Sequence, residues 1–97
     1  MPVLPVPPAL GEGATTDDVV AWVARHLGDL ARSQTRWGVY LETRTLGPLA
    51  QGRLHFVEGS RHKSTGWIFR EYSEREIHER FNEFSPIELW KILESLA

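Results

Sequence analysis

The chain has 97 residues, of which 41% are hydrophobic and none is cysteine, and its formal net charge is −2. Without cysteine the chain forms no disulfides and no zinc or iron–sulfur site ligated by thiolates. So small a net charge gives no overall attraction to nucleic acid or to an anionic membrane, and no apolar run approaches the roughly 20 residues that cross a bilayer. We therefore expect a single cytoplasmic domain that needs neither a cofactor nor a metal ion.

The first part of the chain predicts a tail followed by a helix. Residues 1–13 hold four of the six prolines and predict an extended, proline-rich tail or strap, so that the domain proper spans residues 14–97. Thr15 and Asp18 have the spacing of a capping box. A helix over residues 15–34 is expected, because apolar residues recur there at helical spacing: Val19, Trp22, Val23, Leu27, Leu30 and Ala31.

Three segments rich in β-branched and aromatic residues predict strands over residues 36–44, 52–58 and 67–72. The loop of residues 59–66 carries a basic tip and is longer than the tightest hairpin loops. Alternation along the strands assigns one face of the sheet to the core. The core residues expected from this alternation are Trp37, Val39, Leu41, Leu54, Phe56, Trp67 and Phe69.

The last part of the chain predicts two helices, over residues 74–84 and 86–96. Ser73 with Glu76 and Ser85 with Glu88 are both capping-box patterns, and Pro86 suits the first position of a helix. The last helix is more apolar than one buried face requires, so Trp90 either contacts a partner or covers the edge of the domain. The expected fold is a single small α+β domain of order α-β-β-β-α-α, in which a three-stranded antiparallel sheet has its helices packed on one face.

The polar face of this sheet is the candidate partner-binding surface. Arginine and tyrosine are enriched at protein interfaces, and they also stack bases and neutralise phosphates. A third use is cross-strand pairing of the arginines with glutamates of the same sheet. The candidate residues on this face are Arg36, Tyr40, Arg44, Arg53, His55, Arg70 and Tyr72, with Arg61, His62 and Lys63 of the loop beside them.

The order helix, three strands, helix over residues 15–84 resembles that of the double-stranded-RNA-binding domain. That family grips phosphates with a lysine-rich segment at the start of its second helix, and the matching segment here, residues 73–76, is acidic. A metal site is not expected either, because His55 and Glu58 of one strand point to opposite faces, away from a common ion with His62.

No nucleophile elbow, P-loop or dinucleotide-binding motif is present, so a non-enzymatic function is expected. We predict a small interaction or assembly protein that self-associates, as a homodimer or larger homo-oligomer, through a sheet edge or the C-terminal helix. The alternative is a nucleic-acid-binding module that uses the Arg/Tyr face and the loop of residues 59–66.

Overall fold

The computed structural model describes residues 16–96, with side chains from Val20 onward. Its elements are α1 (Thr16–Val23), β1 (Arg25–Arg32), β2 (Thr35–Leu46), β3 (Leu49–Glu58), β4 (Arg61–Ser64), β5 (Phe69–Glu71), α2 (Glu74–Asn82) and α3 (Pro86–Ser95). The expected α+β fold with an antiparallel sheet is confirmed, but the sheet has five strands instead of three. The likeness in element order to the double-stranded-RNA-binding domain is therefore lost. The proline-rich segment and the Thr15 cap lie outside the described residues.

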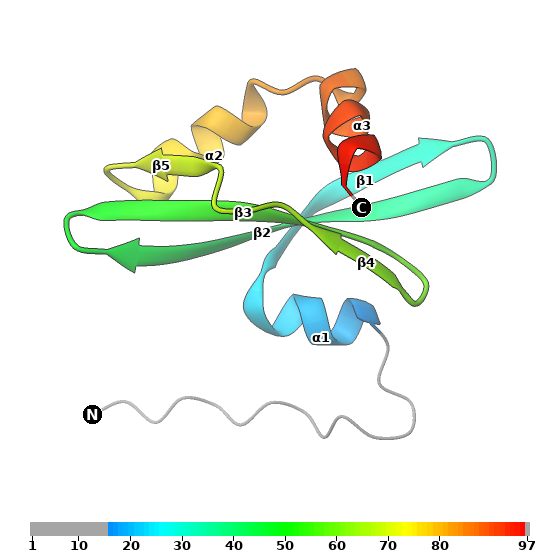
Figure 1. Ribbon diagram of the computed structural model, residues 1–97, viewed down its shortest axis with the longest axis horizontal. Helices are drawn as coiled ribbons and strands as arrows, with labels where there is room; N and C mark the ends of the chain where they lie inside the picture. The colour runs from blue at the N-terminus through cyan, green and yellow to red at the C-terminus, as the bar shows by residue number, and fades with distance from the viewer. Residues whose placement is uncertain (1–15, 97) are drawn as a thin grey trace.

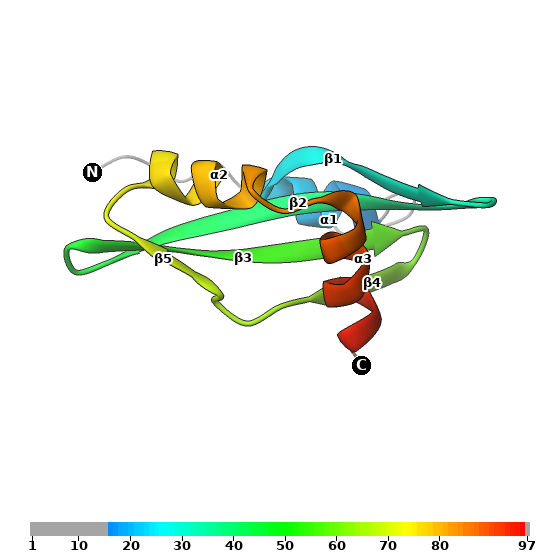
Figure 2. The same ribbon diagram turned by 90° about the horizontal axis from the view of Figure 1, so that it is seen from above.

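The sheet is an antiparallel meander in the order β1-β2-β3-β4, and β5 pairs with β3 beside β4 (Figure 1). His55 pairs with Ser64, and Gly52 pairs with Phe69. The two paired residues are three positions apart along β3 but five positions apart along the outer strands. Strands β4 and β5 are thus one outer strand that a bulge interrupts at residues 65–68. In Figures 1 and 2 the β1–β2 turn and the β2–β3 turn project beyond the helices at opposite ends of the molecule.

The prediction of a helix over residues 15–34 was wrong beyond Val23, because residues 25–32 form strand β1. Its register against β2 shifts between His26 and Gly28. This bulge places Leu27 and Leu30 on the same side, where both pack against the main core. An i, i+3 spacing of apolar residues is typical of a helix, and here a bulged strand produces the same spacing.

The predicted loop of residues 59–66 was also wrong, since half of it, Arg61–Ser64, is strand β4. Glu58 pairs with Arg61, so β3 and β4 are joined by a two-residue turn. Gly59 has a φ of +58° in this turn, a conformation that glycine adopts without steric cost. The third predicted strand, residues 67–72, is correspondingly shortened to Phe69–Glu71.

The main core lies between the sheet and helices α2 and α3, on what we call the first face of the sheet. Leu54, Phe56 and Ile77 are fully buried at its centre, and Phe69 meets Phe84 edge to face with ring centroids 6.0 Å apart. The other buried residues of this core are Leu30, Trp37, Val39, Leu41, Leu89 and Leu93. Of the predicted core residues only Trp67 is missing, because it lies in the bulge.

Helix α1 packs on the opposite side of the sheet, which we call the second face (Figure 1). Its Val20 is buried against Tyr40 and Val57. The expectation that all helices pack on one face was therefore wrong. No helix among the described residues is long and apolar enough to span a membrane.

The predicted division of the C-terminal region at Pro86 is confirmed. The Ser73 side chain accepts a hydrogen bond from the backbone N–H of Glu76 at the start of α2. At the start of α3 the capping box is complete, because Ser85 and Glu88 each accept a hydrogen bond from the other's backbone N–H. These caps satisfy amide groups that the first turn of a helix leaves without partners.

Candidate functional site

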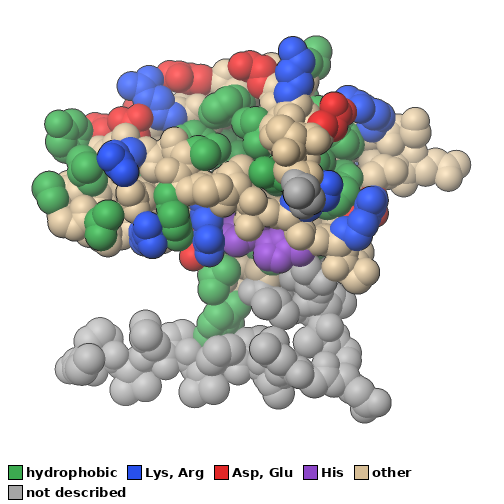
Figure 3. All heavy atoms as spheres, viewed as in Figure 1, with side chains coloured by type: hydrophobic (Ala, Val, Ile, Leu, Met, Phe, Trp, Pro, Cys, Tyr) green, Lys and Arg blue, Asp and Glu red, His purple; other side chains and the backbone are tan. Residues whose placement is uncertain are grey.

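The second face carries the polar side chains that strands β2 and β3 place in cross-strand pairs. Tyr40 lies opposite His55, and Glu42 lies opposite Arg53. One step further along, Arg44 lies opposite Gln51. The sheet register thus gathers most of the predicted site residues on one face. Figure 3 shows basic and histidine side chains side by side along the sheet, while most of the acidic side chains in this view lie over the helices above.

Glu42 is the ionic centre of this face. Its Oε1 atom accepts a hydrogen bond from Arg53 Nε at 2.7 Å and lies 2.8 Å from His55 Nε2. Burial by itself raises the pKa of Glu42, but the hydrogen bonds from His55 and Arg53 outweigh it and hold the pKa below its ordinary value. Glu42 is therefore ionised at neutral pH and balances the charge of Arg53.

Two histidines extend this interaction towards the surface. His55 is only 4% exposed, and its Nδ1 atom lies 2.8 Å from Nε2 of the exposed His62. Partial desolvation of the His62 ring, together with the nearby His55 and Arg53, lowers the pKa of His62. Neutral imidazoles satisfy both contacts if His62 Nε2–H donates to His55 and His55 Nε2–H donates to Glu42. Both ring nitrogens of His55 are then in use.

Arg44 and Arg53 lie over the ring of Trp67, and we call these three residues the arginine–tryptophan cluster. The guanidinium carbons lie 3.9 Å and 4.5 Å from the ring centroid, respectively. Each arginine is also anchored through Nε, Arg44 to Gln51 Oε1 at 2.9 Å and Arg53 to Glu42. The terminal nitrogens of both guanidinium groups form no hydrogen bond or ion pair with any described residue.

The structure separates several residues that the sequence placed together. Tyr40 and His55 lie on the second face but are buried, so they are not displayed. The basic tip is divided: His62 lies on the second face, whereas Arg61 and Lys63 lie on the first. There Arg61 pairs with Glu58 and lies over Trp37, 4.7 Å from its ring centroid.

The remaining predicted partner-binding residues lie at the margins of the molecule. Arg36 and Arg70 are exposed on the second face, Arg36 at 3.9 Å from Asp29 and Arg70 opposite Gln51 in the register. Tyr72 follows β5 and is 78% exposed. Trp90 is half-buried against the main core, and Arg32 covers its ring at 4.3 Å.

Sequence reasoning missed Trp67 as a residue of this site. Simple alternation across residues 67–72 places Trp67 on the same face as Phe69, and the bulge breaks that alternation. The only local signal is Thr65-Gly66, where a glycine interrupts the strand pattern. Within the described part of the chain, no three or more histidine, aspartate or glutamate side chains lie where they could hold a metal ion.

Charge is distributed unevenly along the chain and hence between its layers. Residues 16–70, which contain α1 and the strands up to Arg70, hold eight Arg and Lys against five Asp and Glu, a net charge of +3. Residues 71–88, which contain α2, hold six Glu against two Arg, a net charge of −4. Helix α2 packs on the first face, so the acidic helix and the arginine-bearing second face lie on opposite sides of the sheet.

Comparisons with protein-family models, curated proteins and solved structures found no match.

Proposed function

We propose that the domain is a non-enzymatic interaction module that binds an acidic segment of a partner protein at the arginine–tryptophan cluster. The observation that carries the proposal is that Arg44 and Arg53 are both fixed at Nε, while their terminal N–H groups have no partner among the described residues. A guanidinium group binds carboxylates through two parallel hydrogen bonds. Because Trp67 and the two Nε contacts already order these side chains, binding costs less conformational entropy.

Carboxylates suit this surface better than nucleic-acid bases do. Base stacking needs an open aromatic ring, but at the cluster Tyr40 is buried and the ring of Trp67 already has two guanidinium groups over it. The exposed ring of Tyr72 lies at the margin of the molecule, after β5. The acidic helix α2 also repels a long polyanion more strongly than a short acidic peptide. Nucleic-acid binding is the competing proposal, and the experiment below includes a probe for it.

The histidine cluster supports a binding function more than a catalytic one. Ser64 lies opposite His55 in the register of β3 and β4, as a nucleophile beside a base would. However, both ring nitrogens of His55 already contact Glu42 and His62. His55 therefore lacks a free nitrogen to take a proton from the Ser64 hydroxyl, and we assign the cluster to positioning Glu42 and Arg53.

The experiment measures binding of a fluorescein-labelled glutamate-rich peptide by fluorescence anisotropy, with a neutral glutamine peptide and a single-stranded oligonucleotide as further probes. We expect the wild-type protein to bind the glutamate-rich peptide with an affinity that falls as salt rises. Arg44→Gln is expected to weaken binding by about tenfold, the loss of roughly one charged hydrogen bond.

Arg75→Gln is the matched control, because it changes the net charge equally but lies on α2, where the Arg75 side chain is 88% exposed. This variant should bind the peptide as the wild type does. Equal losses for the two variants would show that only overall charge matters and would overturn the proposed site. Tight oligonucleotide binding without peptide binding would favour the nucleic-acid module instead.

A further inference from the structure

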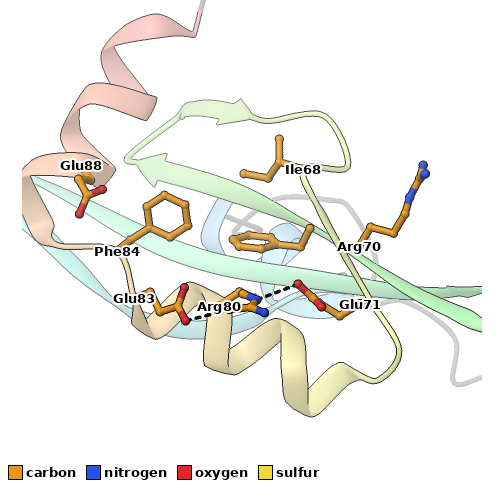
Figure 4. A pocket seen from close by; sticks show the side chains of 8 residues that line it. Ile68, Arg70, Glu71, Arg80, Glu83, Phe84 and Glu88 are labelled. Carbon is orange, nitrogen blue, oxygen red and sulfur yellow. Dashed lines mark hydrogen bonds and ion pairs between the residues drawn. The ribbon is translucent and has the colours of Figure 1, made fainter.

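A cleft of about 520 Å³ opens beside the ends of three elements, between β5, the end of α2 and the start of α3 (Figure 4). Its apolar lining comes from Phe69, the half-buried Phe84 and Ile68, which is 50% exposed. Its volume lies within the roughly 300–1,000 Å³ typical of binding pockets. The cleft therefore has room for a large apolar side chain.

The rim of this cleft is acidic. Glu71, Glu83 and Glu88 all line it. Arg80 pairs with Glu71 and Glu83, both at 3.0 Å, and Glu88 accepts the backbone N–H of Ser85 in the capping box of α3. The lining thus holds three carboxylates and one cation that pairs with two of them. Arg70 also borders the cleft, but Figure 4 shows its side chain extending away from it. The group that fits here is an apolar side chain with a cation beside it.

The same chain presents such a group on α1. Trp22 and Val23 are 41% and 52% exposed, and Arg25, two residues after Val23 at the start of β1, is also exposed. Every other tryptophan has a guanidinium group over its ring: Trp37, Trp67 and Trp90. Trp22 has no such contact with the described residues. It is therefore the tryptophan whose ring is most available for a partner.

We infer that Trp22 of one copy inserts into the cleft of a second copy, with Arg25 facing the carboxylates of the rim. The contact forms between copies because α1 packs on the second face, whereas the cleft lies beside helices that pack on the first face. The Trp22 knob and the cleft are different surfaces, so the contact is head-to-tail, and a pair of copies keeps one free knob and one free cleft. It uses neither Arg44 nor Arg53 and is independent of the proposed binding of an acidic partner.

Analytical ultracentrifugation over a wide concentration range tests this inference. The wild-type protein should show a mass that grows with concentration. Trp22→Ser and Ile68→Glu, which change exposed side chains at the knob and the cleft, should each weaken self-association at least about thirtyfold, the effect of losing a hot-spot contact. Ile87→Glu is the matched control, since Ile87 is 69% exposed on α3 and does not line the cleft.

Mixing the two variants gives the sharpest result. Trp22→Ser keeps an intact cleft and Ile68→Glu keeps an intact knob, so the mixture should form a 1:1 complex that does not grow further. A wild-type protein that stays monomeric at every concentration would overturn the inference. So would a mixture that fails to associate, or a loss in Ile87→Glu as large as that in Ile68→Glu. None of these results bears on peptide binding at Arg44, so the two proposals fail separately.

Discussion

At Gly52 helix α2 lies so close to the sheet that a side chain has no room, which allows a quantitative test of the packing. A Cβ atom added there would lie 2.9 Å from Cγ2 of the buried Ile77. It would also lie 3.3 Å from Leu41 Cδ1 and 3.3 Å from Phe69 Cβ. Because Ile77 is fully buried, its methyl group has no solvent into which to retreat. Gly52→Ala should therefore force α2 away from β3.

The expected loss follows from two opposing effects. Overpacking of a filled core costs about 1–3 kcal/mol, whereas alanine in a strand interior recovers about 0.5–1 kcal/mol of backbone entropy relative to glycine. The net loss in the free energy of unfolding should be about 1–2 kcal/mol. For a domain of this size each kcal/mol corresponds to roughly 4–8 °C in Tm.

Urea unfolding followed by circular dichroism measures this difference, with Gly28→Ala as the matched control. Gly28 is also a strand glycine, but a Cβ atom there would meet nothing within 4 Å. Gly28→Ala should therefore leave stability unchanged or raise it by about 0.4–1 kcal/mol. If Gly52→Ala proved as stable as Gly28→Ala, the close approach of α2 to β3 would be refuted.

Three further predictions concern single side chains. Glu42→Gln should lower the free energy of unfolding by about 2 kcal/mol in urea titrations, because Arg53 and His55 lose their charged acceptor. An unchanged urea midpoint would contradict this. The pKa of His62 is lowered from 6.5 in the folded protein, so the unfolded chain binds the proton first, and stability should fall as the pH drops below 6.5 towards the folded pKa. His62→Gln should flatten this part of the curve of Tm against pH, and an equally steep curve would refute the assignment. Ser85→Ala should cost about 1 kcal/mol through loss of the α3 cap, measured by thermal unfolding, and a Tm equal to that of the wild type would count against the cap.

Local chemistry explains which parts of the fold could be predicted from the sequence. The caps at Ser73 and Ser85 and the break at Pro86 depend on neighbouring residues alone, and all three are present. The capping box predicted for Ser73 and Glu76 is only half formed, because Glu76 accepts the backbone N–H of Tyr72 in place of that of Ser73. Alternation likewise assigned Val39, Leu54 and Phe56 to the core correctly, because β2 and β3 pair without a bulge over these residues.

Bulges account for the main errors. The bulge beside Leu27 made β1 resemble a helix, and the bulge at residues 65–68 moved Trp67 out of alignment with Phe69. Both depend on pairing with a neighbouring strand, which residue spacing along one strand does not encode. The sequence therefore predicted the arginines of the candidate site, because the alternation along β2 and β3 determines which face they lie on. It did not predict Trp67, the tryptophan that holds them in place.

Side-chain NMR during a titration with the glutamate-rich peptide tests the central claim most directly. The claim predicts that the Nε–H signals of Arg44 and Arg53 and the indole N–H signal of Trp67 shift together and saturate at one peptide concentration. The signal of Arg75 on α2 should stay in place. Shifts confined to other arginines, or no saturable shift at Arg44, Arg53 and Trp67, would contradict the account.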